Sequence, residues 1–483
     1  MSLGHLKDIS QGAHIHFMGI CGTAMASLAG LLKDRGFRIT GSDANPYPPM
    51  STQLEKLGIE IKNGYRAENL HPKPDFVIVG NVISRTNVEA VELEKLGLPY
   101  TSLPSAIGEF IIGDLESVVV SGTHGKTTTT ALMSWIFECA KLDPGFLIGG
   151  IPQNFSVSFR NSKGKYFIIE GDEYDTAFFD KVPKFIHYRP KHVILTSIEF
   201  DHADIYRDLD HVKESFIMLL KLIPEDGTLV YHGADKNIQD ILHYTRCRNI
   251  ISYGKSSPDK TSVAAQYEVL NQDAEGLSFR VTLNNQNLGT FNTKMTGEHN
   301  LLNLTAGISM SHRLGLPQET VSSAIRSFSG VKRRQEILGE PGGVLVIEDF
   351  AHHPTAVRET VNGIKVKYPQ RKMFAVFEPR SATSRRKVFQ KDYVQAFRTA
   401  DEVILAEAFD QQKIDEANRF SSQELASDIN AEAGGRPKAS SLQNADHIVE
   451  QLKSKAQKGD LILIMSNGGF DNIYGKLLKA LAL

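Results

Sequence analysis

The sequence has few of the features that mark disulfide-bonded, zinc-stapled or membrane-spanning proteins. It contains three cysteines, Cys21, Cys139 and Cys247, whose wide spacing gives neither a disulfide framework nor a zinc motif. No apolar run approaches the ~18 residues of a membrane span, because Lys221 interrupts the best candidate, 216–223. These absences predict a protein of a reducing compartment, and we expect a cytoplasmic location without membrane insertion.

Neither sign of charge is in excess. Lys and Arg total 54 against 56 Asp and Glu, a formal net charge of −2, which argues against a surface that coats nucleic acid or an anionic membrane. Hydrophobic residues make up 41% of the 483 positions, enough for complete cores, and this length predicts about three domains. The first eight residues contain no long apolar segment, so we expect no signal peptide.

The segment 117–139 predicts a loop that binds phosphate at the start of a helix. Its β-branched valines predict a buried strand, and a tight turn of small or flexible residues follows. The turn consists of Gly122, Thr123, His124 and Gly125. Lys126 and Thr127 then open a helix, so that N–H groups and the Lys126 ammonium face phosphate and the Thr127 hydroxyl is placed to bind Mg²⁺. Because Val120 stands where the strict P-loop begins with glycine, the alternative is an ordinary turn with a chance Lys-Thr pair.

Residues 1–113 alternate strand and helix patterns, which predicts a Rossmann-like domain. Gly19 and Gly22 lie in the first strand-to-helix turn and Asp43 follows the next strand, close to a dinucleotide fingerprint, although the spacing differs from G-x-G-x-x-G. A later strand ends in a polar turn at Asn81, and ligands of open α/β sheets gather at such carboxyl ends. The alternative is tight packing of strand and helix with no ligand.

In the second predicted domain, 114–328, two buried strands end in acidic residues. One runs directly into Glu170 and the other into Asp201-His202. In a parallel sheet these ends share an edge with the phosphate loop, and Mg²⁺ on nucleotide phosphates needs one or two protein ligands there. We therefore expect Glu170 and His202 to serve the metal; the alternatives are an exposed loop acid and a satisfied core histidine.

The end of the second domain holds two further patterns. Residues 262–295 read as short antiparallel strands with a turn at Asn284-Asn285, and a helix begins near residue 297. Asn300 and Asn303 are three residues apart, so they share a helix face and can present amides to an adenine edge. The alternative is helix capping and ordinary surface polarity.

The third predicted domain, 329–483, again alternates strands and helices and reads as Rossmann-like. Polar turns follow several strands, at 348–354, 378–381 and 466–470, while the polar stretch 410–445 predicts helix and loop. The predicted fold is therefore α/β with three domains: a Rossmann-like N-terminal domain, a central ATPase domain with a P-loop-type parallel sheet, and a Rossmann-like C-terminal domain.

Several motifs, in this order, resemble those of the Mur ligase family, the ATP-dependent amide-forming enzymes of peptidoglycan assembly. They are Gly122–Thr129, Glu170, Asp201-His202, Gly297–Asn303, Val331–Arg334 and Asp349–Pro354. Within the family, further stretches are most similar to the members that join L-alanyl-γ-D-glutamyl-meso-diaminopimelate to UDP-N-acetylmuramate in peptidoglycan recycling. These stretches are Gly41–Ser51, Asp172–Lys181, Lys184–Tyr188, Glu378–Ser381 and Met465–Phe470.

The resemblance implies roles for residues that match the motifs. Lys126, Glu170 and His202 would be catalytic, and Thr127, Glu170 and His202 would bind Mg²⁺. ATP would be bound by Gly122, Thr123, His124, Gly125, Lys126, Thr127, Thr128, Asn300 and Asn303, with Arg334 and Asp349 reaching it from the linker and the third domain. The UDP part of the sugar would lie on the first domain, at Gly19, Gly22, Asp43 and Asn81.

The resemblance also implies a mechanism. The γ-phosphate of ATP would pass to the lactyl carboxylate of UDP-N-acetylmuramate, and the peptide amine would attack the acyl phosphate. Lys126 and Mg²⁺ would offset the repulsion between carboxylate and triphosphate. Arg380 is the candidate to bind a carboxylate of the murein tripeptide, because its guanidinium can donate two hydrogen bonds. His352 or His353 is the candidate to assist loss of the amine proton.

The chain departs from the family pattern at Ile217 and, more mildly, at Gly171, where the family often has alanine; four alternatives remain. Ile217 occupies the position where several family members carry a carbamylated lysine, so no such group is expected. The alternatives are the family member that adds L-alanine to the same sugar, a folylpolyglutamate synthase relative, an NAD-dependent oxidoreductase built on the first domain, and a nucleotide-binding protein without activity.

Overall fold

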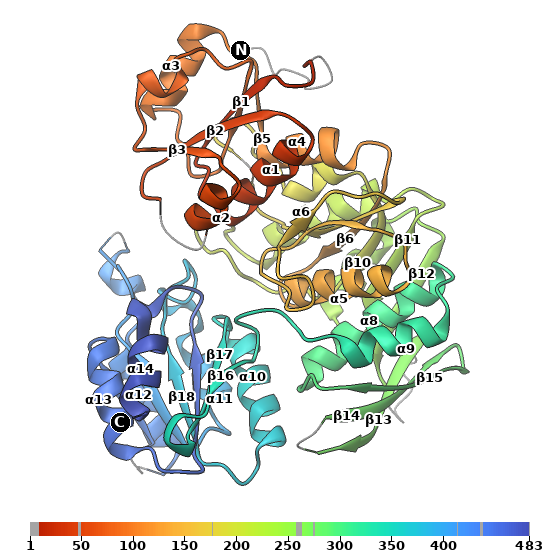
Figure 1. Cartoon of the computed structure of the whole chain (residues 1–483). Helices are drawn as coiled ribbons and strands as arrows, with labels where there is room; N and C mark the ends of the chain where they lie inside the picture. Colours follow the sequence, from red (N-terminus) through yellow and green to blue (C-terminus); the bar gives the residue numbers. More distant parts are fainter. Residues whose placement is uncertain are drawn as a thin grey trace.

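The computed structural model describes residues 9–46, 50–175, 177–256, 263–273, 276–412, 414–434 and 438–482. Three sheets follow one another along the chain, each covered by helices (Figure 1). The predicted α/β class with three sheet-based units is confirmed. Three segments named in the sequence analysis lie outside the described residues. They are residues 1–8, where we expect no signal peptide, residues 47–49 of the stretch Gly41–Ser51, and residue 176 of the stretch Asp172–Lys181.

The first sheet is all parallel, in the order β3-β2-β1-β4-β5. Its strands are β1 His14–Met18, β2 Arg38–Asp43, β3 Glu60–Asn63, β4 Phe76–Val79 and β5 Tyr100–Ser102, and its helices are α1 Thr23–Asp34, α2 Met50–Lys56, α3 Val88–Leu96 and α4 Leu103–Ala106. The strand order reverses between β1 and β4, and ligands of open α/β sheets bind at such a switch point.

The central sheet has the order β15-β14-β13-β12-β11-β10-β6-β9-β7-β8. Its strands are β6 Glu116–Ser121, β7 Gly145–Leu147, β8 Phe159–Arg160, β9 Tyr166–Gly171, β10 Pro190–Leu195, β11 Thr228–His232, β12 Asn249–Lys255, β13 Ala265–Gln272, β14 Leu277–Leu283 and β15 Gln286–Thr293. Its helices are α5 Lys126–Cys139, α6 Leu209–Leu222, α7 Lys236–Ile241, α8 Glu298–Arg313 and α9 Gln318–Ser327. The predicted antiparallel patch is confirmed as β13–β15, whose turn at Asn284 and Asn285 has positive φ at both residues.

The third sheet has the order β16-β17-β21-β18-β19-β20, with only β16 antiparallel to its neighbour. Its strands are β16 Glu336–Gly339, β17 Leu345–Asp349, β18 Met373–Phe377, β19 Glu402–Ala406, β20 Ala439–Leu442 and β21 Leu461–Met465, and its helices are α10 Pro354–Lys367, α11 Gln390–Ala396, α12 Ser422–Glu432, α13 Ala445–Lys455 and α14 Ile473–Leu481. The helix-and-loop prediction for 410–445 was wrong at β20. That strand, Ala-Ser-Ser-Leu, is half-buried, and it is held by pairing with β19 rather than by a hydrophobic pattern of its own.

One apolar core joins the first two domains. A continuous cluster of buried side chains extends from Ile15 in β1 and Leu28 in α1 to Val119 in β6 and Phe216 in α6. The two faces of the third sheet have separate clusters of their own. Contacts between the central and third domains include polar ones, such as the hydrogen bond from the Thr296 hydroxyl to the Gly363 carbonyl at 3.2 Å. In the part of the chain that the structure describes, no helix is long and apolar enough to cross a membrane.

Candidate active site

The loop between β6 and α5 has the geometry expected of a phosphate-binding turn. Gly122 and Gly125 adopt φ values of +130° and +82°, which residues with a side chain rarely adopt. A Cβ atom on Gly125 would lie 2.5 Å from Asn303 Oδ1, so this position also requires glycine for close approach to α8. The first turn of α5 begins at Lys126, and its free N–H groups open toward the loop.

The sheet brings Glu170 beside the phosphate loop. Strand β6 lies between β9 and β10, parallel to both, with Val120 opposite Glu170. The Thr127 hydroxyl donates to Glu170 Oε2 at 2.9 Å, and the Gly149 N–H donates to Oε1 at 2.5 Å. Burial raises the pKa of Glu170, and the nearby charge of Asp172 raises it further. Hydroxyl and carboxylate oxygens therefore meet where the sequence predicts a metal.

Lys126 is held by acidic residues that the sequence analysis did not assign. Its Nζ donates to the Gly122 carbonyl at 2.6 Å and to Glu173 Oε2 at 3.2 Å, and lies 3.9 Å from Asp172 Oδ1. Burial by itself lowers the Lys126 pKa, but the charges of Glu173 and Asp172 raise it above its ordinary value. The Lys126 ammonium is therefore charged at neutral pH, with its hydrogen bonds made to the Gly122 carbonyl and to Glu173.

A second buried lysine balances this acidic pair. Lys184 Nζ lies 3.0 Å from Asp172 Oδ2, which also accepts the Tyr174 hydroxyl at 2.9 Å. Burial raises the Asp172 pKa, but the two lysines and the Tyr174 bond overcome this effect and lower it to about 2. Lys184 stands in a stretch that we quoted for the resemblance, but its sequence position, far from the loop, gave no signal of this contact.

His202 and Asp201 lie at the end of the segment that follows β10. His202 Nε2 is 3.7 Å from Glu173 Oε1, so the histidine reaches the same acidic cluster as Lys126. Asp201 Oδ1 accepts the His202 N–H at 2.7 Å and the hydroxyl of Thr383, from the third domain, at 2.6 Å. Burial raises the Asp201 pKa, but the charges of the neighbouring histidines hold it well below its usual range. Asp201 thus links the two domains at the site.

The linker and the third domain contribute Arg334 and Asp349. The Arg334 guanidinium lies 4.6 Å from the centre of the Phe350 ring, and Asp349 accepts the N–H of Gln335 at 2.8 Å and of Ala351 at 2.7 Å. Burial lowers the Arg334 pKa, and the charges of Asp349 and Glu170 offset this effect only in part. The structure therefore brings the predicted residues of the loop, β9, linker and β17 into one region.

Arg333, which we did not single out, fixes the linker to the third domain. Its Nε donates to Glu348 Oε1 at 2.6 Å, and its Nη2 donates to the Ser466 carbonyl at 3.1 Å. Its guanidinium also lies 5.1 Å from the centre of the Phe350 ring. The backbone of Arg333 has a φ of +62°, in the left-handed region that residues with a side chain rarely adopt.

The two predicted asparagines of α8 differ. Asn303 is buried against the phosphate loop at Gly125. Asn300 is also buried, but its side-chain amide donates to the Thr296 carbonyl at 2.7 Å, a local bond within the first turn. The structure therefore brings Asn303, and not the Asn300 amide group, to the loop.

In the first domain, the predicted residues lie at the carboxyl edge of the sheet. The Gly19 N–H donates to the Ser42 carbonyl at 2.8 Å, and Asp43 Oδ2 accepts the Cys21 N–H at 2.9 Å, while Gly22 precedes α1. Asn81 is exposed in the turn after β4, next to Val82, whose side chain packs over Gly19. These residues therefore surround the switch point between β1 and β4.

A buried carboxylate supports this edge from beneath. Glu89 of α3 is fully buried, and its carboxylate accepts the Ser42 hydroxyl at 2.6 Å, the Arg66 N–H at 3.3 Å and the Asn69 amide. His16 Nε2 lies 3.9 Å away. Burial by itself raises the Glu89 pKa, but the nearby His16 and the hydrogen bonds from Ser42 and Asn69 hold it below its ordinary value. This buried network was not apparent from the sequence.

Arg380 lies at the carboxyl edge of the third sheet. Its guanidinium stacks 3.8 Å from the centre of the Phe409 ring and donates to Glu378 Oε1 at 3.3 Å. It belongs to the same loop as Thr383, which reaches Asp201. Arg380 therefore lies on the loop that faces the central domain.

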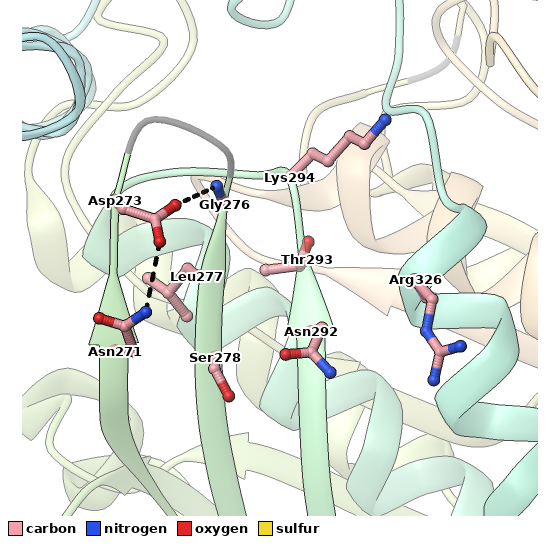
Figure 2. Close-up of a pocket in the computed structure, with 9 residues that line it drawn as sticks. All are labelled: Asn271, Asp273, Gly276, Leu277, Ser278, Asn292, Thr293, Lys294 and Arg326. Atoms are coloured by element: carbon pink, nitrogen blue, oxygen red, sulfur yellow. Dashed lines mark hydrogen bonds between the residues drawn. The ribbon is translucent and has the colours of Figure 1, made fainter.

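Two cavities lie near the central domain. One of about 390 Å³, between the central and third domains, is lined in part by Arg334, Gln335 and Thr296. The other, of about 280 Å³, lies along the edge of β13–β15 and is lined by residues including Asp273 and Arg326 (Figure 2). None of the predicted site residues lines the second cavity, so it belongs to the hairpin edge rather than to the phosphate loop.

Three family models match the chain along most of its length. Residues 14–114 match the model described as Mur ligase family, catalytic domain; residues 120–311 match the Mur ligase middle domain; and residues 333–468 match the Mur ligase, glutamate ligase domain.

Individual relatives are similar over the whole chain. The chain is 40% identical over 476 residues to UDP-N-acetylmuramate–L-alanyl-γ-D-glutamyl-meso-2,6-diaminoheptandioate ligase of Escherichia coli (strain K12), covering 97% of this chain and 98% of that protein. It is 34% identical over 468 residues to UDP-N-acetylmuramate–L-alanine ligase of Clostridium botulinum (strain Langeland), with 97% of each covered. Among solved structures, a murein peptide ligase from Psychrobacter arcticus 273-4 matches with a TM-score of 0.73 at 37% identity, covering 98% of this chain and 99% of that one.

Proposed function

Because the chain belongs to the Mur ligase family, it is an ATP-dependent amide ligase, and we propose that it joins L-alanyl-γ-D-glutamyl-meso-diaminopimelate to UDP-N-acetylmuramate in peptidoglycan recycling. The observation that carries the choice of substrates is 40% identity, over 97% of the chain, to the relative named for these substrates. Relatives named for L-alanine are 34% identical, so addition of L-alanine is the second candidate.

ATP binding is proposed for the region around Lys126. The loop 122–128 supplies N–H groups and a cation, both of which stabilise a triphosphate. Asn303, buried against this loop, and Arg334 and Asp349, from the linker and β17, surround the same region. Asn300 is proposed to support ATP binding indirectly, because its side-chain amide donates to the Thr296 carbonyl and stabilises the start of α8.

Mg²⁺ binding is part of the proposal, and the donors fit that ion. Thr127 and Glu170 offer a hydroxyl and a carboxylate whose oxygens are 2.9 Å apart, and Mg²⁺ prefers such hard oxygen ligands together with phosphate. His202 would complete the protein's contribution. When bound, the ion would neutralise charge on the phosphates.

The residues of this chain would then position the reacting groups. Lys126 leaves Glu173 for the β- and γ-phosphates, and its charge reduces the repulsion between the triphosphate and the lactyl carboxylate of the sugar. The carboxylate oxygen attacks the γ-phosphorus, ADP departs, and an acyl phosphate forms. The tripeptide amine adds to its carbonyl carbon, and the tetrahedral intermediate collapses to the amide and inorganic phosphate. Most of the rate enhancement would come from positioning and electrostatics.

The attacking amine must lose a proton, and of the two candidates, His352 and His353, we propose His352 as the group that accepts it. His352 Nδ1 lies 3.0 Å from the Phe350 carbonyl and donates its N–H there, which leaves a lone pair on Nε2. That atom is 3.9 Å from Asp201 Oδ2, beyond hydrogen-bond length. Arg380 is proposed to bind a carboxylate of the incoming peptide. That carboxylate would compete with Glu378, which is paired with Arg380 at 3.3 Å.

The first domain would hold the UDP part of the sugar. Gly19, with a φ of +82°, lies in a turn at the switch point of the sheet, where a diphosphate is the proposed ligand. An oxidoreductase on this domain would leave the loop at Lys126 unexplained.

A cytoplasmic location is also proposed, and it is supported by the three free thiols.

The experiment is a phosphate-release assay with ATP, Mg²⁺ and UDP-N-acetylmuramate, in which the tripeptide and free L-alanine are offered in parallel. We expect release with the tripeptide and amide product of matching mass. Turnover with L-alanine alone would replace the proposal by the second candidate. Purified protein that releases no phosphate with either amine would contradict the whole proposal.

A further inference from the structure

A cluster of two histidines and a glutamate joins the central and third domains beside the phosphate loop. His124 comes from the loop, Glu199 from the segment after β10, and His353 from the position that caps α10 in the third domain. One ligand atom from each of the three side chains lies within 4.8 Å of the other two. The proposed function uses the backbone of His124 in the phosphate loop but gives no role to the Glu199 carboxylate or to the two imidazole rings.

The spacing of these atoms differs from that of ordinary hydrogen bonds. His124 Nε2 and His353 Nδ1 each lie 3.6 Å from the same atom, Glu199 Oε2. Hydrogen bonds between such atoms are shorter, about 2.7–3.2 Å. Two ligands on one tetrahedral zinc ion, each about 2.1 Å from the metal, stand roughly 3.4 Å apart. The two separations from Glu199 therefore approach those of a metal site, and the two histidine nitrogens lie within 4.8 Å of each other.

The surrounding bonds leave the ligand atoms available. His124 Nε2 is buried and has no hydrogen-bond partner, which is unfavourable unless a ligand satisfies it. His353 Nε2 donates to the Phe200 carbonyl at 3.2 Å, which puts the lone pair on Nδ1. The Thr355 hydroxyl donates to Glu199 Oε2 at 2.6 Å and orients the carboxylate, as outer hydrogen bonds do at metal centres. Only the long 3.3 Å bond from the Thr355 N–H to Nδ1 would be given up.

We propose that His124, Glu199 and His353 bind a divalent transition metal ion of the zinc class, and that this ion fastens the third domain to the central domain. Two imidazoles and one carboxylate suit zinc better than magnesium, which prefers oxygen ligands. These ligands are different residues from Thr127, Glu170 and His202. A fourth position would remain for water. The proposal does not depend on the choice of amine substrate.

The test uses the full chain, freed of metal by chelation, without nucleotide. One equivalent of Co²⁺, a spectroscopic substitute for Zn²⁺, should give the intense visible absorption of a four- or five-coordinate site. His353→Ala and Glu199→Gln should abolish this absorption and weaken Zn²⁺ binding, measured by calorimetry, by at least about 10-fold. His202→Ala, which alters the proposed magnesium site, is the matched control and should keep the absorption. His124→Gln provides a further ligand variant if His353→Ala does not fold.

Three outcomes would overturn the site. The first is absorption of only the weak, six-coordinate kind in the wild-type chain. The second is absorption that survives in all ligand variants, and the third is absorption that disappears in His202→Ala. The fastening is tested separately by hydrogen exchange at the Ala203 N–H, which donates across the interface to the Thr383 hydroxyl at 3.2 Å. Zn²⁺ should slow this exchange in the wild-type chain and not in His353→Ala; equal exchange with and without Zn²⁺ would refute the fastening.

Discussion

Replacing Glu89 by glutamine is expected to destabilise the first domain and weaken binding of the nucleotide sugar. The Glu89 carboxylate is fully buried and accepts bonds from Ser42, Arg66 and Asn69 beneath the edge where Asp43 lies. Hydrogen bonds to a buried charge contribute roughly 1.5–3 kcal/mol. Glutamine keeps one oxygen acceptor but loses the charge, so we expect a loss of about 2 kcal/mol. Because the first and central domains share one core and should unfold together, this loss should lower their melting temperature by about 4 °C.

The pH dependence gives the same experiment a second readout. The folded-state pKa of Glu89 lies below its ordinary value, so its stabilisation is present above the unfolded pKa and is lost as pH falls through the folded pKa. The wild-type chain should therefore lose stability on acidification more steeply than Glu89→Gln, and the two melting temperatures should converge. Thermal unfolding, followed by calorimetry at neutral and acidic pH without ligands, measures both effects.

A control on the same helix separates this network from the general effect of removing an acid. Glu94 lies on the same helix and is exposed, and exposed charges contribute about 0–1 kcal/mol. Glu94→Gln should therefore leave stability and the KM for UDP-N-acetylmuramate nearly unchanged, while Glu89→Gln raises that KM. Equal melting temperatures for the two variants at neutral pH, or a gap between Glu89→Gln and the wild-type chain that does not close in acid, would refute the reasoning.

Four further outcomes are expected at the other sites. Lys126→Met should lower the rate of phosphate release by at least about 100-fold with the fold intact by circular dichroism, since it removes a cation from the developing phosphate charge; a rate within threefold of the wild type would contradict that role. Thr383→Val removes the 2.6 Å bond to Asp201 and should speed hydrogen exchange at the interface with the third domain, whereas unchanged exchange would show that this bond does not hold the domains. Gly125→Ala places a Cβ at 2.5 Å from a neighbouring amide oxygen, at a φ of +82°, and should weaken ATP binding in calorimetry more than 10-fold; unaltered affinity would mean that the loop adapts. Arg380→Ala should raise the KM for the tripeptide far more than that for ATP, and equal changes in both would remove Arg380 from the peptide site.

The sequence predicted features that depend on local patterns. The phosphate loop follows from valines, glycines and a Lys-Thr pair that are adjacent in the chain, and the position of Glu170 follows because parallel strands end at one edge. The family and the three-sheet α/β class were also predicted and are confirmed. The boundaries of the domains and the roles of the site residues stay predictions.

What the sequence did not reveal depends on contacts between distant segments. Lys184 reaches Asp172 because a short helical turn after β9 brings it back to the sheet edge, and no spacing rule encodes that return. The network around Glu89 likewise joins a helix to β2 across the first domain. Strand β20 was missed because its half-buried serines carry no apolar pattern and its conformation is set by pairing with β19. In each case tertiary contact, rather than local propensity, determines the structure.

The continuous apolar core between the first and central domains has a consequence for motion. Separating those domains would expose buried side chains such as Phe216 and Leu28 to water, at about 25 cal/mol for each Å² uncovered. Opening the third domain breaks polar contacts that water can replace, such as the bond between Thr296 and Gly363. We therefore expect the chain to move as two bodies, the first and central domains together and the third domain by itself. The hinge would lie in the linker, next to Arg333, which is hydrogen-bonded to Glu348 of the third domain.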